Sequence, residues 1–70
     1  MTYRQALRAI EQLGYRIQAQ TRHDTAVSYD ACDMKSSSRR SRLVHGPAGT
    51  SQEAMVGLWR LVQAREIGMV

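Results

Sequence analysis

The sequence predicts an α+β protein, a single small domain over residues 1–70 with the order helix, strand, strand, short strand, helix. Residues near both ends of the chain repeat apolar side chains at three- and four-residue steps, which is the period of a helix. Residues 15–20 and 27–32 alternate between apolar and polar side chains, which is the period of a strand. We therefore expect an antiparallel sheet of two to three strands with both helices packed on one face.

The first helix is predicted over residues 3–13. Thr2 is placed to cap its start with Gln5 as the reciprocal partner, and Gly14 stands where a left-handed C-terminal cap is needed. The apolar face of this helix comprises Tyr3, Ala6, Leu7, Ile10 and Leu13, and the outward side chains are Arg4, Arg8, Glu11 and Gln12.

Two strands follow, over residues 15–20 and 27–32, with a polar connection over residues 21–25. The side chains expected to face the helices are Tyr15, Ile17, Ala19, Val27, Tyr29 and Ala31. Those expected on the solvent side include Arg16, Gln18, Gln20, Ser28 and Asp30. This outer side has no aromatic residue that would stack on a nucleobase.

A polar loop is predicted over residues 33–41, and its basic, serine-rich part over 34–41 is expected to be exposed and mobile. Residues 42–45 predict a third strand, and Gly46 to Gly49 are expected to interrupt the regular secondary structure after it. Thr50 or Ser51 then caps a second helix, with Glu53 completing a capping box. Its apolar stripe comprises Ala54, Met55, Leu58, Trp59, Leu61 and Val62 and continues to Ile67. Gly57 interrupts this helix, and a close contact would explain it.

The composition favours a binding protein over an enzyme. A chain of this length has a marginal core and little room for a deep, dry cavity. Its one cysteine excludes an internal disulfide and a multi-cysteine zinc site. No apolar run reaches a membrane span, and the N-terminus lacks the apolar stretch of a secretory signal, so we expect a cytoplasmic protein without membrane contact.

The net charge of +4 comes almost entirely from arginine, which makes planar contacts to carboxylate and phosphate. The predicted partner-binding residues are Arg39, Arg40 and Arg42, followed by Lys35, Arg16 and Trp59. Serine and arginine together are typical of phosphate contacts. Three interpretations of the basic loop stay open: a solvated loop, a nucleic-acid contact, and a contact with an acidic protein surface. Homodimerisation through an exposed flank of the second helix also stays open.

The titratable side chains suggest no catalytic or metal site. They comprise His23, Asp24, Asp30, Cys32, Asp33 and His45, and no pair among them has the usual metal-ligand spacing. Cys32 and His45 are the one conceivable nucleophile pair. We expect no catalytic residue, no metal and no cofactor.

The predicted order of elements resembles the double-stranded-RNA-binding domain over the whole chain. In that family the second helix opens with a basic cluster across the major groove, whereas Thr50, Ser51, Gln52 and Glu53 carry no base here. This resemblance implies direct nucleic-acid binding, which is the alternative function.

A second resemblance is to small phage-encoded proteins of the helix–strand–strand–helix sandwich type, anti-CRISPR proteins among them. It is carried by the turn Gly46-Pro47-Ala48-Gly49-Thr50 and by the helix segments Glu53-Ala54-Met55 and Leu58-Trp59-Arg60-Leu61. It implies a phage or mobile-element protein that acts in the host cytoplasm. There it would bind a bacterial protein or nucleoprotein complex as an inhibitor or adaptor.

Overall fold

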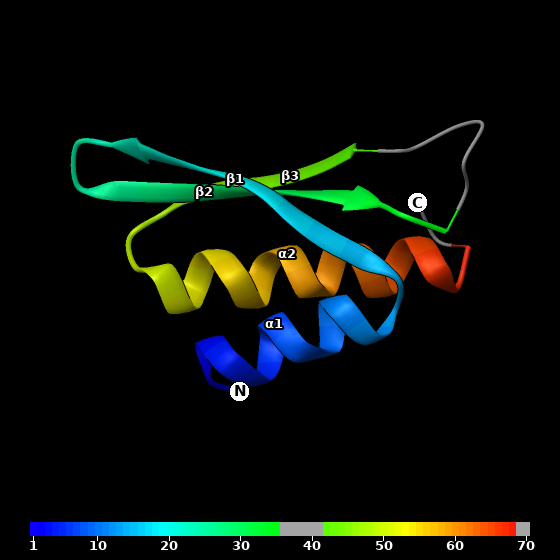
Figure 1. Ribbon diagram of the computed structural model, residues 1–70. Coiled ribbons are helices and arrows are strands. Elements are labelled where there is room, and N and C mark those ends of the chain that lie inside the picture. The colour runs from blue at the N-terminus through cyan, green and yellow to red at the C-terminus, as the bar shows by residue number, and fades with distance from the viewer. Residues whose placement is uncertain (36–41, 69–70) are drawn as a thin grey trace.

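The predicted order of helices and strands is confirmed by the computed structural model, which describes residues 1–35 and 42–68 (Figure 1). The elements are α1 (Tyr3–Gln12), β1 (Tyr15–His23), β2 (Ala26–Asp33), β3 (Arg42–Ala48) and α2 (Ser51–Glu66). The strands form one antiparallel sheet in the order β1-β2-β3, and both helices cover the same face of it. Neither α1 nor α2 is long and apolar enough to cross a membrane.

Both helices begin at the predicted caps. The Thr2 hydroxyl accepts from the Gln5 amide and the Gln5 side chain accepts from the Thr2 amide, which is the reciprocal capping box. The Thr50 hydroxyl accepts from the Glu53 amide at 3.1 Å. Gly14 follows α1 with a φ of +89°, the left-handed conformation that glycine adopts without strain.

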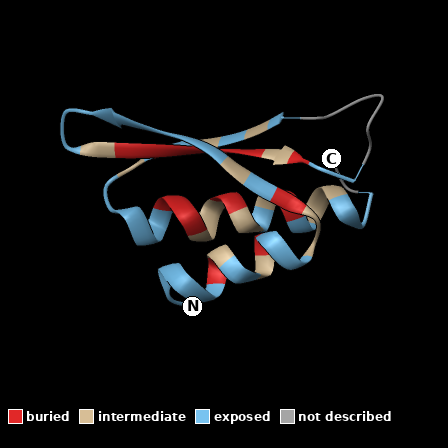
Figure 2. Ribbon diagram, viewed as in Figure 1, coloured by how far each residue is buried: buried red, intermediate tan, exposed pale blue. Residues whose placement is uncertain are grey.

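The core lies between the helices and the inner face of the sheet. Its largest fully buried side chains are Ile10 from α1 and Met55, Leu58 and Val62 from α2. Tyr15, Tyr29 and Ala31 meet them from the strands. Figure 2 shows that burial follows β2 along most of its length, because β2 has a strand on each side. Each fully buried large side chain contributes about 1.5–3 kcal/mol to folding.

A two-residue turn joins β1 to β2. His23 pairs with Ala26, so Asp24 and Thr25 alone make the connection, with Asp24 at a φ of +54°. Aspartate tolerates this left-handed conformation better than most residues. The tip of the hairpin projects beyond both helices (Figure 1).

The inward–outward alternation predicted for β1 is wrong beyond Ile17. Ile17 pairs with Ala31, but Ala19 pairs with Asp30, because Gln18 forms a bulge that has no partner on β2. One extra residue moves every following side chain to the other face. Ala19 therefore lies on the outer face, and Gln20 lies on the inner face. β1 also continues to His23, through most of the segment predicted as a connection.

The third strand is confirmed and is longer than predicted. β3 continues to Ala48, so Gly46 and Pro47 belong to the strand instead of breaking the chain. Gly46 has a φ of +139°, and a Cβ there would lie 2.8 Å from Cα of Ser28. Only glycine lets the two backbones approach this closely.

Three further predictions are corrected. Asp33 belongs to β2 and is buried instead of opening a loop. Ile67 follows α2 and is 66% exposed, so it does not extend the apolar stripe. Tyr3 lies at the edge of the core, 36% exposed, with its ring 6.0 Å from that of Tyr29.

Candidate functional site

The candidate site is the face of the sheet opposite the helices, which we call the open face. Its side chains in register are Arg16, Ala19 and Thr21 on β1, Ser28, Asp30 and Cys32 on β2, and Arg42 and Val44 on β3. Within residues 1–35 and 42–68 no helix lies over it (Figure 1).

Two arginines flank the only cysteine on this face. Cys32 pairs with Arg16 on one side and with Arg42 on the other. Directly opposed residues of antiparallel strands project their side chains from the same face. Since neighbouring strands lie about 4.8 Å apart, the two arginine Cα atoms are about 10 Å apart. The sheet thus brings together two predicted binding residues that are far apart in the sequence.

Asp30 fixes the position of Arg42. The Asp30 carboxylate forms an ion pair with Nη2 of Arg42, and its side chain is 8% exposed whereas that of Arg42 is 69% exposed. The guanidinium has five N–H donors, so this contact orients it and leaves donors that no described side chain engages. The sequence placed Asp30 on the solvent side but gave no sign of this role.

Ser28 and Asp30 lie on the outer face as predicted but are buried, at 7% and 6% exposed. Both belong to the central strand, where neighbours on each side cover them. Gly46 brings the β3 backbone against Ser28, and Nε2 of His23 lies 3.0 Å from the Ser28 hydroxyl. Val44, opposite Asp30, is 52% exposed and gives the open face an apolar spot.

The other predicted binding residues lie elsewhere. Lys35 pairs with Glu66 at the end of α2, and its Nζ lies 5.2 Å from the centre of the Tyr15 ring. It therefore ties the strands to α2 rather than joining the open face. Trp59 is half-buried on α2 against the core. Arg39 and Arg40, with the rest of 36–41, lie outside the described residues.

Arg65 reinforces the contact between α2 and the strands. Its Nη1 donates to the Tyr15 hydroxyl at 3.0 Å, and its Nη2 lies 3.5 Å from the Asp33 carboxylate. Burial raises the pKa of the Tyr15 hydroxyl above its usual value, although the nearby Arg65 charge partly opposes this. Burial and the neighbouring Tyr29 also raise the pKa of Tyr3.

The conceivable nucleophile pair does not form. Cys32 lies on the open face, whereas His45 pairs with Tyr29 on the inner face, so the sheet separates them. The described residues contain no group of three His, Cys, Asp or Glu side chains that could hold a metal ion.

His45 instead explains Gly57. A Cβ on Gly57 would lie 2.2–2.6 Å from three atoms of the imidazole ring, so the predicted close contact at this glycine is confirmed. Nδ1 of His45 is buried without a hydrogen-bond partner among the described residues. A shallow groove of about 400 Å³ beside this ring carries both Glu53 and Arg60, and mixed charge selects no class of ligand.

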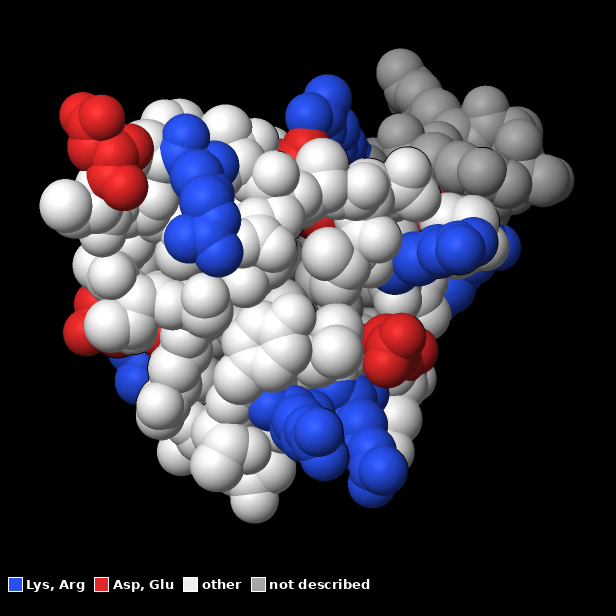
Figure 3. Space-filling model, turned by 60° about the vertical axis from the view of Figure 1, so that its left-hand side comes forward, with Lys and Arg blue, Asp and Glu red and all other residues white. Residues whose placement is uncertain are grey.

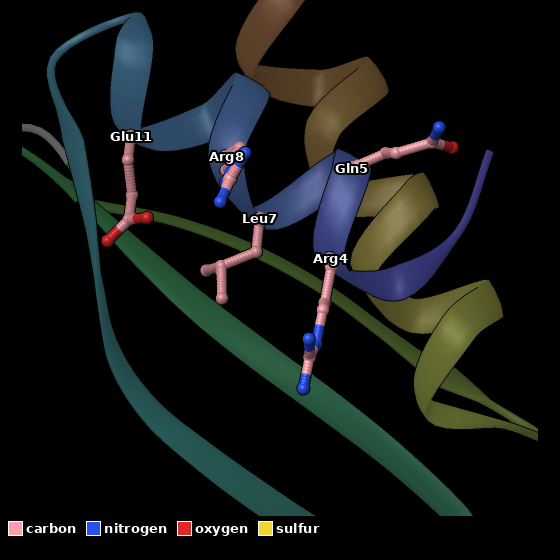
Figure 4. Close-up of a pocket in the computed structure, with 5 residues that line it drawn as sticks. All are labelled: Arg4, Gln5, Leu7, Arg8 and Glu11. Atoms are coloured by element: carbon pink, nitrogen blue, oxygen red, sulfur yellow. The ribbon is translucent and has the colours of Figure 1, made fainter.

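A larger groove, of about 500 Å³, runs along α1, away from the open face. Figure 4 shows Arg4, Leu7 and Glu11 extending from α1 toward the strands, whereas Gln5 points away. Arg8 completes the lining. In Figure 3 the basic side chains form separate groups divided by uncharged surface, so this view shows no continuous basic face.

Comparison of the chain with protein-family models, with curated proteins and with solved structures found no match.

Proposed function

We propose that this protein is a non-enzymatic binding module of the kind encoded by phages and mobile elements. It acts as an inhibitor or adaptor by docking its open face on an acidic surface of a bacterial protein or nucleoprotein complex. One observation carries the proposal: Arg16 and Arg42 flank Cys32 on the face that no described helix covers. The resemblance in size and element order to anti-CRISPR proteins supports the kind of partner.

The geometry suits recognition of carboxylate or phosphate groups. Arginine presents a planar fork of donors, and Asp30 already orients that of Arg42, so less side-chain freedom is lost on binding. Ala19 and Val44 are small or apolar, so a flat partner surface can approach the strands closely. Arginine and apolar surface together are typical of the residues that dominate interface affinity.

Direct nucleic-acid binding is the alternative. The described open face has no phenylalanine, tyrosine or tryptophan side chain for base stacking, so nucleic acid would be held there mainly through its phosphates. Two arginine contacts predict that log Kd changes with log salt concentration with a slope of about 1.4–1.8. Fluorescence-anisotropy titrations with single- and double-stranded DNA and RNA at two salt concentrations measure this slope.

The proposal is tested by comparing what variants capture from a bacterial lysate. Arg16→Glu reverses one charge of the open face without touching the core. Arg42→Gln is combined with Asp30→Asn, so that no buried carboxylate loses its partner. Arg60→Glu, on the exposed side of α2, is the matched control with the same change in net charge as Arg16→Glu. We expect the control to retain the bound complex and the open-face variants to lose it.

Cys32 provides a direct footprint of the same surface. It is half-exposed between the two arginines, so a partner on the open face should slow its alkylation by iodoacetamide. Unchanged alkylation in a complex that Arg16→Glu still forms would move the site off the open face. Salt-sensitive binding of oligonucleotides, lost in the same variants, would select the nucleic-acid alternative.

A further inference from the structure

Among residues 1–35 and 42–68, no strand pairs with the outer edge of β1. In the order β1-β2-β3 this strand has β2 on one side only, and Ala19–His23 are exposed. β3 forms the other edge, but Pro47 has no N–H to donate there. An edge strand presents a row of backbone donors and acceptors that an added strand can satisfy. The β1 edge is therefore the better site for strand addition.

The groove along α1 lies beneath this edge. α1 contacts β1, whereas α2 contacts β2 and β3, so α1 is the helix below the β1 side of the sheet. Leu7, half-buried, has Arg4 three residues before it and Glu11 four residues after it on one face of the helix, and Arg8 lies four residues after Arg4. Figure 4 shows this face turned toward the strands.

The bulge at Gln18 gives this side its charge. Beyond the bulge Arg22 pairs with Val27, a core residue, and therefore lies on the inner face of the sheet with Gln20. Arg22 from the strand and Arg4 and Arg8 from α1 outnumber two exposed carboxylates, Glu11 of the α1 groove and Asp24 of the hairpin turn. A partner on the β1 edge would meet an excess of positive charge on the inner side.

We propose that β1 binds an extended acidic peptide segment as a fourth strand, with alternate Asp or Glu side chains pointing over the α1 groove. Strand addition obtains affinity from backbone hydrogen bonds and specificity from the alternate side chains. This surface meets the open face along β1, which contributes Ala19 and Thr21 to both, but the proposal does not depend on a partner at the open face. Nucleic acid would meet the same charges but lacks the peptide groups that pair with a strand edge.

The test uses a fluorescein-labelled peptide of about eight residues that alternates glutamate and valine. Two forms are N-methylated, each on one alternate set of peptide nitrogens. Only one edge of an added strand faces β1. Methylation of the nitrogens on that edge removes the N–H groups that would pair with β1, so this form should lose binding, whereas the other form should keep it. A lysine–valine peptide of the same length should not bind.

Arg4→Glu/Arg8→Glu should weaken peptide binding by about tenfold or more, since each reversal replaces an attraction with a repulsion. The control pairs Arg60→Glu with Gln63→Glu, both on the exposed side of α2, and should bind like the unmodified chain. It lowers the net charge by three units, against four in Arg4→Glu/Arg8→Glu. In the complex, hydrogen exchange should slow at β1 amides between Ala19 and His23 but not at β3. This second measurement does not depend on any variant folding.

Four results would overturn the proposal. They are no binding of the glutamate–valine peptide at millimolar concentration, equal binding of both N-methylated forms, protection of β3 instead of β1, and unchanged affinity in Arg4→Glu/Arg8→Glu. Displacement of the peptide by a single-stranded oligonucleotide that binds more tightly would assign the groove to nucleic acid instead.

Discussion

Replacing Gly57 with alanine separates two opposing effects on stability. In an exposed helix the change stabilises by about 1 kcal/mol, because alanine has the higher helix propensity. Here the new Cβ would lie 2.2 Å from Cε1 of His45. Non-bonded carbon atoms pack at about 3.5–4.0 Å, so the ring or the helix must move by more than about 1 Å. Overpacking of this kind costs about 1–3 kcal/mol.

Over most of this range the steric cost exceeds the propensity gain, and we expect Gly57→Ala to destabilise the protein by up to about 2 kcal/mol. In a chain of this size that lowers the melting temperature by up to roughly 16 °C. In a His45→Ala background the ring is absent, and the same substitution should stabilise by about 1 kcal/mol. The effect changes sign, with a coupling energy of about 1–3 kcal/mol between the two positions.

Urea unfolding of the four proteins in this cycle measures the coupling. Circular dichroism and the fluorescence of Trp59, half-buried on the same helix, should give coincident transitions. Gln63, exposed on α2, calibrates the propensity effect through Gln63→Ala and Gln63→Gly. If Gly57→Ala stabilises both backgrounds equally, the His45 ring does not rest on Gly57, and the argument from the contact fails.

Two further predictions follow from buried contacts in the strands. Gly46→Ala should lower the free energy of unfolding by about 2 kcal/mol or more, because its Cβ would meet the Ser28 backbone and the residue has a positive φ. Gly68→Ala also has a positive φ but no atom near its Cβ, so it should lower the free energy of unfolding by only about 1 kcal/mol. Thermal unfolding of both variants measures the difference. The raised pKa of Tyr15 means that the folded state holds its phenolic proton more strongly than the unfolded state. The contribution of this pKa shift to the free energy of unfolding is fully present below pH ~10, and it is lost as the pH rises through the pKa of Tyr15 in the folded state. Unfolding midpoints should therefore fall above pH ~10 in the unmodified chain, and less so in Tyr15→Phe; an equal fall in both would contradict this assignment.

Local signals in the sequence were sufficient for the helices and the fold class. Thr2 with Gln5, Thr50 with Glu53, and Gly14 are side-chain and backbone devices that act within a few residues. Such devices can be recognised without knowing the tertiary structure.

The sheet could be predicted less completely because its details depend on neighbours distant in the sequence. Nothing at Gln18 marks a bulge, since glutamine occurs equally in regular strands. Gly46-Pro47 is typical of a turn, yet here the glycine serves a close approach to Ser28. The burial of Asp30 follows from the central position of β2, which alternation alone does not reveal.

The candidate site was partly predictable for the same reason. Arg16 and Arg42 could be recognised as exposed bases, and their convergence on Cys32 required the strand register. Lys35 looked equivalent to them in the sequence, but Glu66, 31 residues later, engages it. The groove along α1 was not anticipated, because Arg4 and Arg8 looked like ordinary solvated side chains.

The projecting β1–β2 hairpin also offers a place to attach a handle. Asp24 and Thr25 are exposed and lie beyond both helices, and loop tips of this kind tolerate inserted sequence. A biotin-acceptor tag spliced there would anchor the molecule to a sensor surface through the tip. The open face and the α1 groove would then both remain accessible to solution. Competition between their partners could therefore be recorded on a single immobilised sample.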